Sequence, residues 1–475
     1  MVVGDFAQDV QTVIIGAGPG GYVAAIRAAQ LGQEVFLIEK ELTGGVCLNW
    51  GCIPTKAMIE VSGLKAHLEK ASEMGITVKE IRVDLAKLHS WKAGIVQRLR
   101  NGVETLLQKN GVELIRGEAI FSEPGKLMVE SERGIQRVSY ENVIIATGSR
   151  PIELADLPFD GATIIDSNAA IELKEPPEHL LVVGAGSVGI ELGTVYRNLG
   201  SEVTIIETQE TLLPWIDPEI SRVLQRSIKK AGIDLKLGSR ITATESNNGR
   251  VSMTIQQNGK KQLLDADKVL IAIGRRPNTD GMGLRELGLQ TDDRGFIQVN
   301  QKMQTNLAGV YAIGDVVAGP MLAHRASHMG KIAAEVISGE PAAFDNVVVP
   351  GVIFSSLEIA SVGLTEQQAT EQGYSVKAGV FPFRALGRAM TLGEADGVTK
   401  VISDADSGTV LGVHIIGSHA SDLIAEGGLA VESGAHVDDL SLTIHAHPTL
   451  TEGIMEAAED IEHKAIHIFN PPVKK

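Results

Sequence analysis

The chain has 475 residues, too many for one ordinary hydrophobic core, and we expect about three domains. Its 52 glycines, 44% hydrophobic residues and 4% aromatic residues are typical of an α/β protein and argue against a disordered or disulfide-stapled chain. With 43 Lys and Arg against 59 Asp and Glu, the formal charge of −16 disfavours binding to nucleic acid or to an anionic membrane.

The first ten residues contain Asp5 and Asp9 and no basic residue, unlike a secretory signal or an Arg-rich transit peptide. No apolar run reaches the length of a membrane span. We therefore expect a cytoplasmic protein, although a transit peptide removed from a longer precursor would leave no sign here.

A dinucleotide-binding unit follows. An apolar strand over residues 10–15 leads into the turn Gly16-Ala17-Gly18-Pro19-Gly20-Gly21, a helix runs to Gly32, and a second strand over 35–38 ends at Glu39. Gly16, Gly18 and Gly21 permit a tight turn and let pyrophosphate approach backbone amides at the helix N-terminus. Glu39, 18 positions after the third glycine, is placed to bind ribose hydroxyls.

The only two cysteines, Cys47 and Cys52, lie in the glycine-containing segment 44–56. Residues five apart in a regular helix have Cα atoms roughly 8.6 Å apart, beyond disulfide reach, so a bridge requires a break that Gly51 would ease. Pro54 fits the first turn of a helix, which would put Cys52 at its N-terminus, where a thiolate is favoured. Without a third Cys or nearby His a metal site lacks ligands, whereas inert core thiols remain an alternative.

The same unit recurs after a long helix over residues 83–110 and a strand ending in Ala146-Thr147-Gly148. A strand over 179–183 precedes Gly184, Gly186 and Gly189, and the next strand, 202–206, ends at Glu207, again 18 positions after the third glycine. A carboxylate at 207 would repel a 2′-phosphate, so we expect NAD rather than NADP here.

Further along, a strand over 269–273 is closed by Gly274, and residues 310–313 form a strand that ends at Gly314-Asp315. From about residue 349 separated strands and helices predict a third, α+β domain. Near the C-terminus, the segment from His445 to Glu452 has a His, at 445 or 447, with a carboxylate one to two turns onward, a spacing suited to a base and its orienting partner. A packing cluster at a helix start is the alternative for this segment.

Together these blocks resemble the pyridine nucleotide–disulfide oxidoreductase family, and within it the dihydrolipoamide dehydrogenases, over nearly the whole chain. The resemblance implies two Rossmann-like domains and a C-terminal dimerisation domain: residues 1–150 bind FAD, 151–279 bind NAD, 280–348 complete the FAD domain, and 349–475 form the homodimer interface. It assigns two further sets of residues to the cofactors. For FAD these are Lys56, Thr147, Gly148, Gly314, Asp315, Met321, Leu322, Ala323 and His324; for NAD they are Glu191 and Gly274.

The implied activity is oxidation of protein-bound dihydrolipoamide through a Cys47–Cys52 disulfide and FAD, with reduction of NAD⁺ to NADH. His447 of the partner subunit, oriented by Glu452, would act as the base. The implied partners are lipoyl domains of 2-oxo acid dehydrogenase complexes or the glycine cleavage H-protein, and no metal is implied.

The chain also departs from the family pattern. Val46 stands where Thr is usual, Thr55 where Ser is usual, and Trp50 where a small aliphatic residue is usual. Trp50 either packs against a neighbouring helix or reshapes the approach to the cysteines. Two other functions stay open: another NAD(P)H-dependent disulfide reductase of this family, and a non-enzymatic subunit that keeps the flavin fold.

Overall fold

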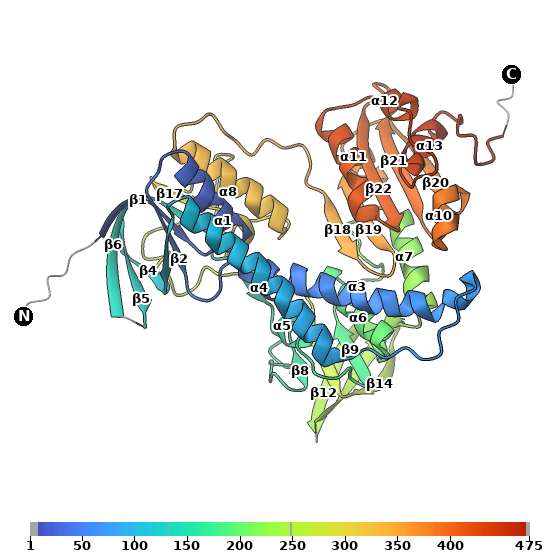
Figure 1. Ribbon diagram of the computed structural model, residues 1–475, viewed down its shortest axis with the longest axis horizontal. Coiled ribbons are helices and arrows are strands. Elements are labelled where there is room, and N and C mark those ends of the chain that lie inside the picture. The colour runs from blue at the N-terminus through green and yellow to red at the C-terminus, as the bar shows by residue number, and fades with distance from the viewer. Residues whose placement is uncertain (1–7, 133, 248, 472–475) are drawn as a thin grey trace, which may run out of the picture.

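The computed structural model describes residues 8–132, 134–247 and 249–471. Within them three sheets with their helices form the body of the molecule (Figure 1). Asp5, on which the expectation about targeting partly depends, lies outside the described residues. The α/β class and the three-part architecture expected from the sequence are confirmed, whereas the exact domain boundaries stay predictions.

The first sheet has a parallel core in the order β3-β2-β1-β6, with β17 added beside β6 and an antiparallel extension of β5 and β4. Its strands are β1 (Gln8–Ile15), β2 (Val35–Glu39), β3 (Glu113–Arg116), β4 (Glu118–Glu123), β5 (Lys126–Ser131), β6 (Gly134–Ile145) and β17 (Val310–Ala312). The core strands are continuous apolar runs because helices cover them, and Ile14, Leu37 and Ile144 are fully buried.

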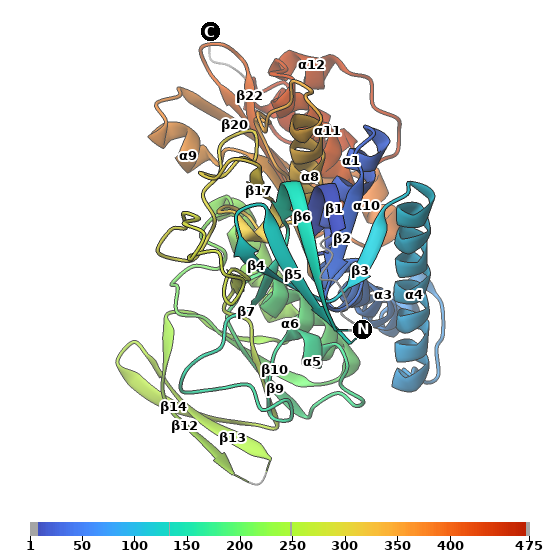
Figure 2. The same cartoon turned by 90° about the vertical axis from the view of Figure 1, so that its left-hand side faces the viewer.

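Helices α1 (Pro19–Gln30) and α8 (Ala323–Ile337) lie side by side on this sheet (Figures 1 and 2). They approach so closely that a Cβ added to Gly330 would stand 2.5 Å from the Gly20 carbonyl oxygen. A segment from beyond residue 300 is therefore part of the first nucleotide-binding unit.

The second sheet is parallel, in the order β11-β10-β9-β15-β8. Its strands are β8 (Ile164–Ile165), β9 (His179–Val183), β10 (Glu202–Ile206), β11 (Asp234–Lys236) and β15 (Lys268–Ile271), with α5 (Ser167–Ala170), α6 (Ser187–Leu199) and α7 (Pro218–Lys230) as its helices. A separate antiparallel sheet, β12 (Ser239–Asn247), β13 (Arg250–Gln257) and β14 (Lys260–Ala266), projects from it (Figure 2). The ribbon β7 (Ser149–Pro151) and β16 (Arg275–Pro277) joins the two nucleotide-binding parts.

The C-terminal part is an antiparallel sheet in the order β18-β19-β22-β21-β20. Its strands are β18 (Gly351–Phe354), β19 (Glu358–Gly363), β20 (Val376–Pro382), β21 (Val398–Asp404) and β22 (Val410–Gly417). Its helices are α9 (Glu366–Glu371), α10 (Gly387–Leu392), α11 (Ala420–Glu432), α12 (Val437–Leu442) and α13 (Glu452–Asp460). Every residue of the central strand β22 is buried.

Helices α2 (Gly45–Asn49), α3 (Cys52–Glu69) and α4 (Leu85–Lys109) connect the parts. On α4, the buried Lys92 donates to the Ile171 carbonyl oxygen and pairs with Glu172 at 2.8 Å, so this helix is bound to the second sheet's domain. The predicted long helix is confirmed with slightly shorter bounds. The two nucleotide-binding parts are thus held at a defined mutual orientation.

Candidate active site

The cysteines form a disulfide across a break between two helices. Cys47 lies in α2, Cys52 is the first residue of α3, and their Cα atoms are 4.7 Å apart. This is much shorter than the separation in a continuous helix, so the predicted break is confirmed. The bridged Cys52 lies at the N-terminus of an 18-residue helix, where backbone N–H groups favour a thiolate once the bond is reduced.

Asn49 and Gly51 shape this loop. The buried Asn49 amide donates to the carbonyl oxygens of Thr43 at 3.1 Å and Gly45 at 2.9 Å. A Cβ at Gly51 would lie 3.0 Å from the Val46 carbonyl oxygen, so a side chain there would crowd the preceding turn. Asn49 was not singled out from the sequence, and its position between the cysteines was the available signal.

The first glycine turn, with Gly16, Gly18 and Gly21, contains glycines of two kinds. A Cβ at Gly16 would stand 2.3 Å from the Ala146 carbonyl oxygen, and one at Gly21 would stand 1.7 Å from the Gly16 carbonyl oxygen. At Gly18 the nearest atom would be 3.9 Å away. The fold itself thus requires the first and third glycines, whereas the second leaves space at the N-terminus of α1, as the approach of a pyrophosphate demands.

The second glycine turn, with Gly184, Gly186 and Gly189, shows the same difference between glycines that the fold requires and one that leaves space. A Cβ at Gly184 would be 2.5 Å from the Ala272 carbonyl oxygen, and one at Gly189 would be 2.0 Å from that of Gly184. A Cβ at Gly186 would meet nothing within 4 Å. Both turns therefore fit a dinucleotide in the same way.

The two acidic residues after these turns have matching contacts. Glu39 accepts from the backbone N–H of Ala17 at 2.7 Å, and Glu207 accepts from that of Ala185 at 2.9 Å. Each carboxylate also accepts a second backbone N–H two residues further along, from Glu41 and Gln209 respectively. These bonds hold each carboxylate against its glycine turn, at the carboxyl end of its strand, which is the position that ribose binding requires.

Lys56 and Glu191, which the sequence analysis assigned to different cofactors, form an ion pair. The Lys56 Nζ lies 2.8 Å from Glu191 Oε2 and 3.0 Å from Oε1. Phe354 donates its backbone N–H to Glu191 Oε1 at 3.0 Å, and its ring centroid lies 4.5 Å from Lys56 Nζ. This contact joins α3, α6 and β18 one turn after Cys52.

Asp315 lies at the junction between the first sheet and the ribbon β7–β16. Its Oδ2 accepts from Ser149 Oγ at 2.6 Å, and Ser149 Oγ in turn accepts from Arg275 Nε at 2.8 Å. Burial lowers the pKa of Arg275, and the charges of Asp315 and Asp166 oppose this shift. Ser149 and Arg275 were missed as site residues, although each directly follows a glycine that the sequence analysis had selected.

The side chains of Thr147 and His324 each contact a backbone carbonyl oxygen of this chain. Thr147 Oγ1 donates to the Asn278 carbonyl oxygen at 2.7 Å, and His324 Nε2 lies 2.8 Å from that of Pro350. The remaining expected flavin and nicotinamide contacts lie at turns or at a helix start. They are Gly148, Gly274 and Gly314, all with positive φ, and Met321, Leu322 and Ala323 at the start of α8.

His447 and Glu452 are brought together as predicted. His447 Nδ1 lies 2.9 Å from Glu452 Oε1, and the Thr449 N–H donates to Glu452 Oε2 at 2.8 Å. Burial opposes the shift, but these two contacts hold the pKa of Glu452 below its usual value. The His447 side chain is 75% exposed in the single subunit, so its Nε2 is open to a group from outside the chain.

The preceding histidine also has a carboxylate partner. His445 Nε2 lies 2.8 Å from Glu426 Oε1, and its Nδ1 lies 2.8 Å from the Thr443 carbonyl oxygen. These contacts tie the histidine loop to α11. Trp50 is partly buried and packs against an apolar cluster that α3, the second sheet with its helices and the C-terminal sheet form together, in line with the first of the two interpretations considered for it.

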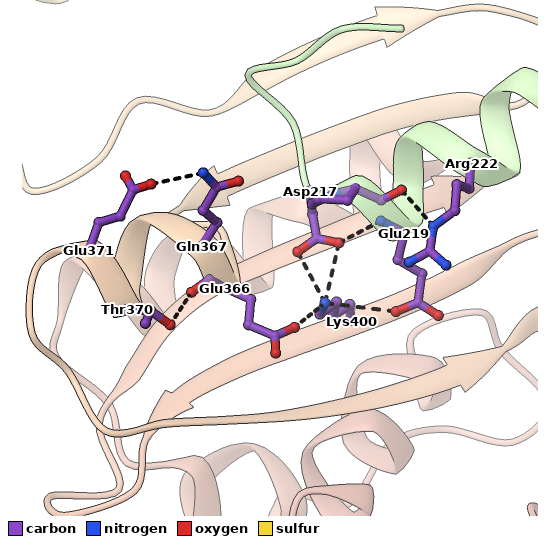
Figure 3. A pocket seen from close by; sticks show the side chains of 9 residues that line it. Asp217, Glu219, Arg222, Glu366, Gln367, Thr370, Glu371 and Lys400 are labelled. Atoms are coloured by element: carbon purple, nitrogen blue, oxygen red, sulfur yellow. Dashed lines mark hydrogen bonds and ion pairs between the residues drawn. The ribbon is translucent and has the colours of Figure 1, made fainter. Parts of the chain in front are cut away.

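A cavity of about 400 Å³ lies away from the cysteines, between α7 and the C-terminal sheet. Figure 3 shows Lys400 from β21 directed toward Asp217 and Glu219 at the start of α7 and toward Glu366 on α9. Lys400 and Asp217 are both buried, and Lys400 Nζ lies 3.1 Å from Asp217 Oδ2, so the cavity borders an interdomain ion pair. Its open, strongly charged lining is unlike a nucleotide site.

Within residues 8–132, 134–247 and 249–471, no group of three His, Cys, Asp or Glu side chains is arranged to hold a metal ion. Over the same residues, no helix combines the length and the apolar character needed to cross a membrane.

Comparisons with known proteins identify the same blocks. Residues 10–330 match the family described as pyridine nucleotide-disulphide oxidoreductase, and residues 349–458 match its dimerisation domain. The dihydrolipoyl dehydrogenase of Geobacillus stearothermophilus is 47% identical over 469 residues, covering 99% of this chain and 100% of that protein. The dihydrolipoyl dehydrogenase of Bacillus subtilis is 46% identical over 469 residues, covering 98% and 100%.

Solved structures agree. LpdA from Mycobacterium tuberculosis superposes with a TM-score of 0.88 at 28% identity, covering 95% of this chain and 99% of that one. The HOCl-induced flavoprotein disulfide reductase RclA from Escherichia coli superposes with a TM-score of 0.84 at 27% identity, covering 94% and 99%. The dimerisation-domain match supports the expected homodimer. The resemblance seen in the sequence is confirmed: the chain belongs to the pyridine nucleotide-disulphide oxidoreductase family.

Proposed function

We propose that this chain is a dihydrolipoyl dehydrogenase, which oxidises protein-bound dihydrolipoamide and reduces NAD⁺. The observation that carries the proposal is the Cys47–Cys52 disulfide at the start of α3, a helix that follows the first nucleotide-binding turn and packs against α6 of the second. Relatives named dihydrolipoyl dehydrogenase, 44–47% identical over nearly the full chain, support the same activity.

The residues of both glycine turns fit the two cofactors. The space beside Gly18 would admit the FAD pyrophosphate, with Glu39 on its ribose, and the space beside Gly186 would admit NAD, with Glu207 on its ribose. Asp315 and the residues at the start of α8 would hold the rest of the flavin. When bound, FAD would accept the electron pair of the reduced cysteines and pass it to NAD⁺ as hydride.

The protein groups would move the proton and exchange the disulfide. His447 of the partner subunit, with Nδ1 held by Glu452, would take a proton from a dihydrolipoyl thiol through Nε2. The resulting thiolate would attack the sulfur of Cys47, releasing Cys52 as a thiolate. The second lipoyl thiol, its proton passing to the leaving Cys47 sulfur, would then displace Cys47, closing the lipoyl ring and leaving both cysteines reduced.

The positive charge of Lys56 would stabilise negative charge that develops near Cys52 and the flavin. Glu191, which holds Lys56, would lie beside the nicotinamide. We further propose lipoyl domains of 2-oxo acid dehydrogenase complexes or the glycine cleavage H-protein as partners, a cytoplasmic location, and domain boundaries near residues 150, 279 and 348.

The principal alternative is another NAD(P)H-dependent disulfide reductase, since a disulfide reductase is among the similar structures. Glu207 disfavours NADPH, the usual donor of glutathione reductases. A non-enzymatic subunit is a weaker alternative, because a structural role has no use for a disulfide, an oriented histidine and two nucleotide turns together.

The test compares turnover of dihydrolipoamide with NAD⁺ against turnover of glutathione disulfide with NADPH. We expect the first pair to react faster, and faster glutathione chemistry would favour the alternative. Cys52→Ser should abolish lipoyl turnover while flavin remains bound, and Thr55→Ser, on the same helix, is the matched control. Colourless purified protein would support the non-enzymatic subunit.

A further inference from the structure

Phe354 contacts both members of the Lys56–Glu191 pair. Its backbone N–H donates to Glu191 Oε1 at 3.0 Å, and Lys56 Nζ lies over its ring, 4.5 Å from the ring centroid. An aromatic face attracts a cation at this distance because the ring carries negative charge density above its plane. No motif in the sequence points to this residue.

Three separate parts of the chain meet at this ammonium. Lys56 comes from α3, Glu191 lies 135 residues later on α6, and Phe354 lies a further 163 residues on, at the end of β18. The Glu191 side chain is 7% exposed, whereas the Lys56 side chain is 33% exposed. A long, partly exposed lysine retains many rotamers when a single carboxylate holds it, so a second contact from another direction restricts its Nζ further.

We propose that Phe354 is a positioning residue: its ring holds the Lys56 ammonium against Glu191, in the place from which that charge acts on the redox pair. The proposal deepens the function proposed above and rests on it for the role of Lys56. The backbone bond to Glu191 survives substitution, so the ring is the part that a variant can remove selectively.

The test measures the reactivity of Lys56 in the holoenzyme by competitive labelling with acetic anhydride and peptide mass spectrometry. Lys87 on α4, whose side chain is 87% exposed, is the internal standard. In Phe354→Leu the ratio of Lys56 to Lys87 labelling should rise about two- to fivefold, the factor expected for loss of one cation–π contact. Phe354→Tyr and Phe354→Trp keep an aromatic face and should restore the wild-type ratio.

Turnover gives a second readout. In Phe354→Leu the kcat for dihydrolipoamide should fall by a similar factor with KM unchanged, and Phe354→Tyr should restore it. Ile353→Val changes the neighbouring residue of the same strand, on its opposite face, and should leave both readouts unchanged. Phe354→Met replaces the Leu variant if that variant does not fold.

The outcomes separate the two proposals. Unchanged Lys56 labelling in Phe354→Leu, or an equal rise in Phe354→Tyr and Phe354→Trp, would overturn the positioning role. Absence of lipoyl turnover in the unmodified protein would instead overturn the proposed function. The labelling ratio would still decide whether the ring holds Lys56.

Discussion

Two glycines of the second turn, Gly186 and Gly189, allow nucleotide binding and folding to be tested separately. Gly186 has an extended backbone (φ −75°, ψ −177°) that alanine also adopts, and an added Cβ would meet nothing within 4 Å. Gly189 has no such room, because its Cβ would stand 2.0 Å from the Gly184 carbonyl oxygen. We therefore expect Gly186→Ala to impair NAD⁺ binding alone, and Gly189→Ala to impair the fold as well.

The stability effects follow from these distances. In Gly186→Ala the lower entropy of the unfolded chain offsets a poorer helix cap, so the free energy of unfolding should change by less than about 1 kcal/mol. In Gly189→Ala the backbone must move by about 1 Å to relieve the overlap, at a cost of about 1–3 kcal/mol or more. That cost lowers Tm by roughly 3–10 °C in a domain of this size.

Calorimetric titration with NAD⁺ and thermal unfolding measure the two effects separately. Gly186→Ala should bind NAD⁺ at least tenfold more weakly, a loss of about 1.4 kcal/mol, with Tm near that of the unmodified protein. Unchanged affinity would mean that the pyrophosphate does not approach this turn. An unchanged Tm in Gly189→Ala would contradict the packing argument.

Three further variants test other contacts. Glu452→Gln removes the charge facing His447, so kcat should fall about 10- to 100-fold with little change in KM, and an unaffected kcat would show that this carboxylate is dispensable. Lys400→Met leaves the fully buried Asp217 unpaired and should cost about 3–5 kcal/mol of unfolding free energy in denaturant melts. Burial alone would lower the pKa of Lys400, but its carboxylate partners raise that pKa above the usual 10.5. The stabilisation that Lys400 provides should therefore be complete below pH 10.5 and be lost as pH rises through the raised pKa. If Lys400→Met lost stability at alkaline pH as steeply as the unmodified protein, this reasoning would be refuted. Glu207→Ala should reduce the preference for NAD⁺ over NADP⁺, measured as the ratio of kcat/KM values, by roughly tenfold, and an unaltered preference would place its origin elsewhere.

The features that could be predicted from the sequence are those that short segments determine. Each glycine turn forms between a strand and the following helix, so the spacing of Gly16, Gly18 and Gly21 was sufficient to locate it. The two cysteines are close for the same reason, since only five positions separate them. His447 and Glu452 likewise lie within one loop and the first residue of α13.

Contacts between distant segments could not be predicted in this way. Lys56 and Glu191 were assigned to different cofactors, and nothing in either local pattern indicated that they pair. In the sequence Phe354 has the pattern of an ordinary strand residue. Its contacts with Lys56 and Glu191 exist only because β18 lies beside α6 in the fold. The packing of Trp50 against an apolar cluster drawn from three parts of the chain depends in the same way on how those parts are arranged.

The amino-acid sequence by itself determined the two nucleotide turns, the cysteine loop and the histidine–carboxylate pair, because backbone geometry within a few residues specifies them. Only the tertiary structure decided which charges meet between domains: Lys56 with Glu191, Lys400 with Asp217, and Lys92 with Glu172. Such pairs depend on the packing of whole sheets and helices, where many weak apolar contacts act together and no short pattern records the result.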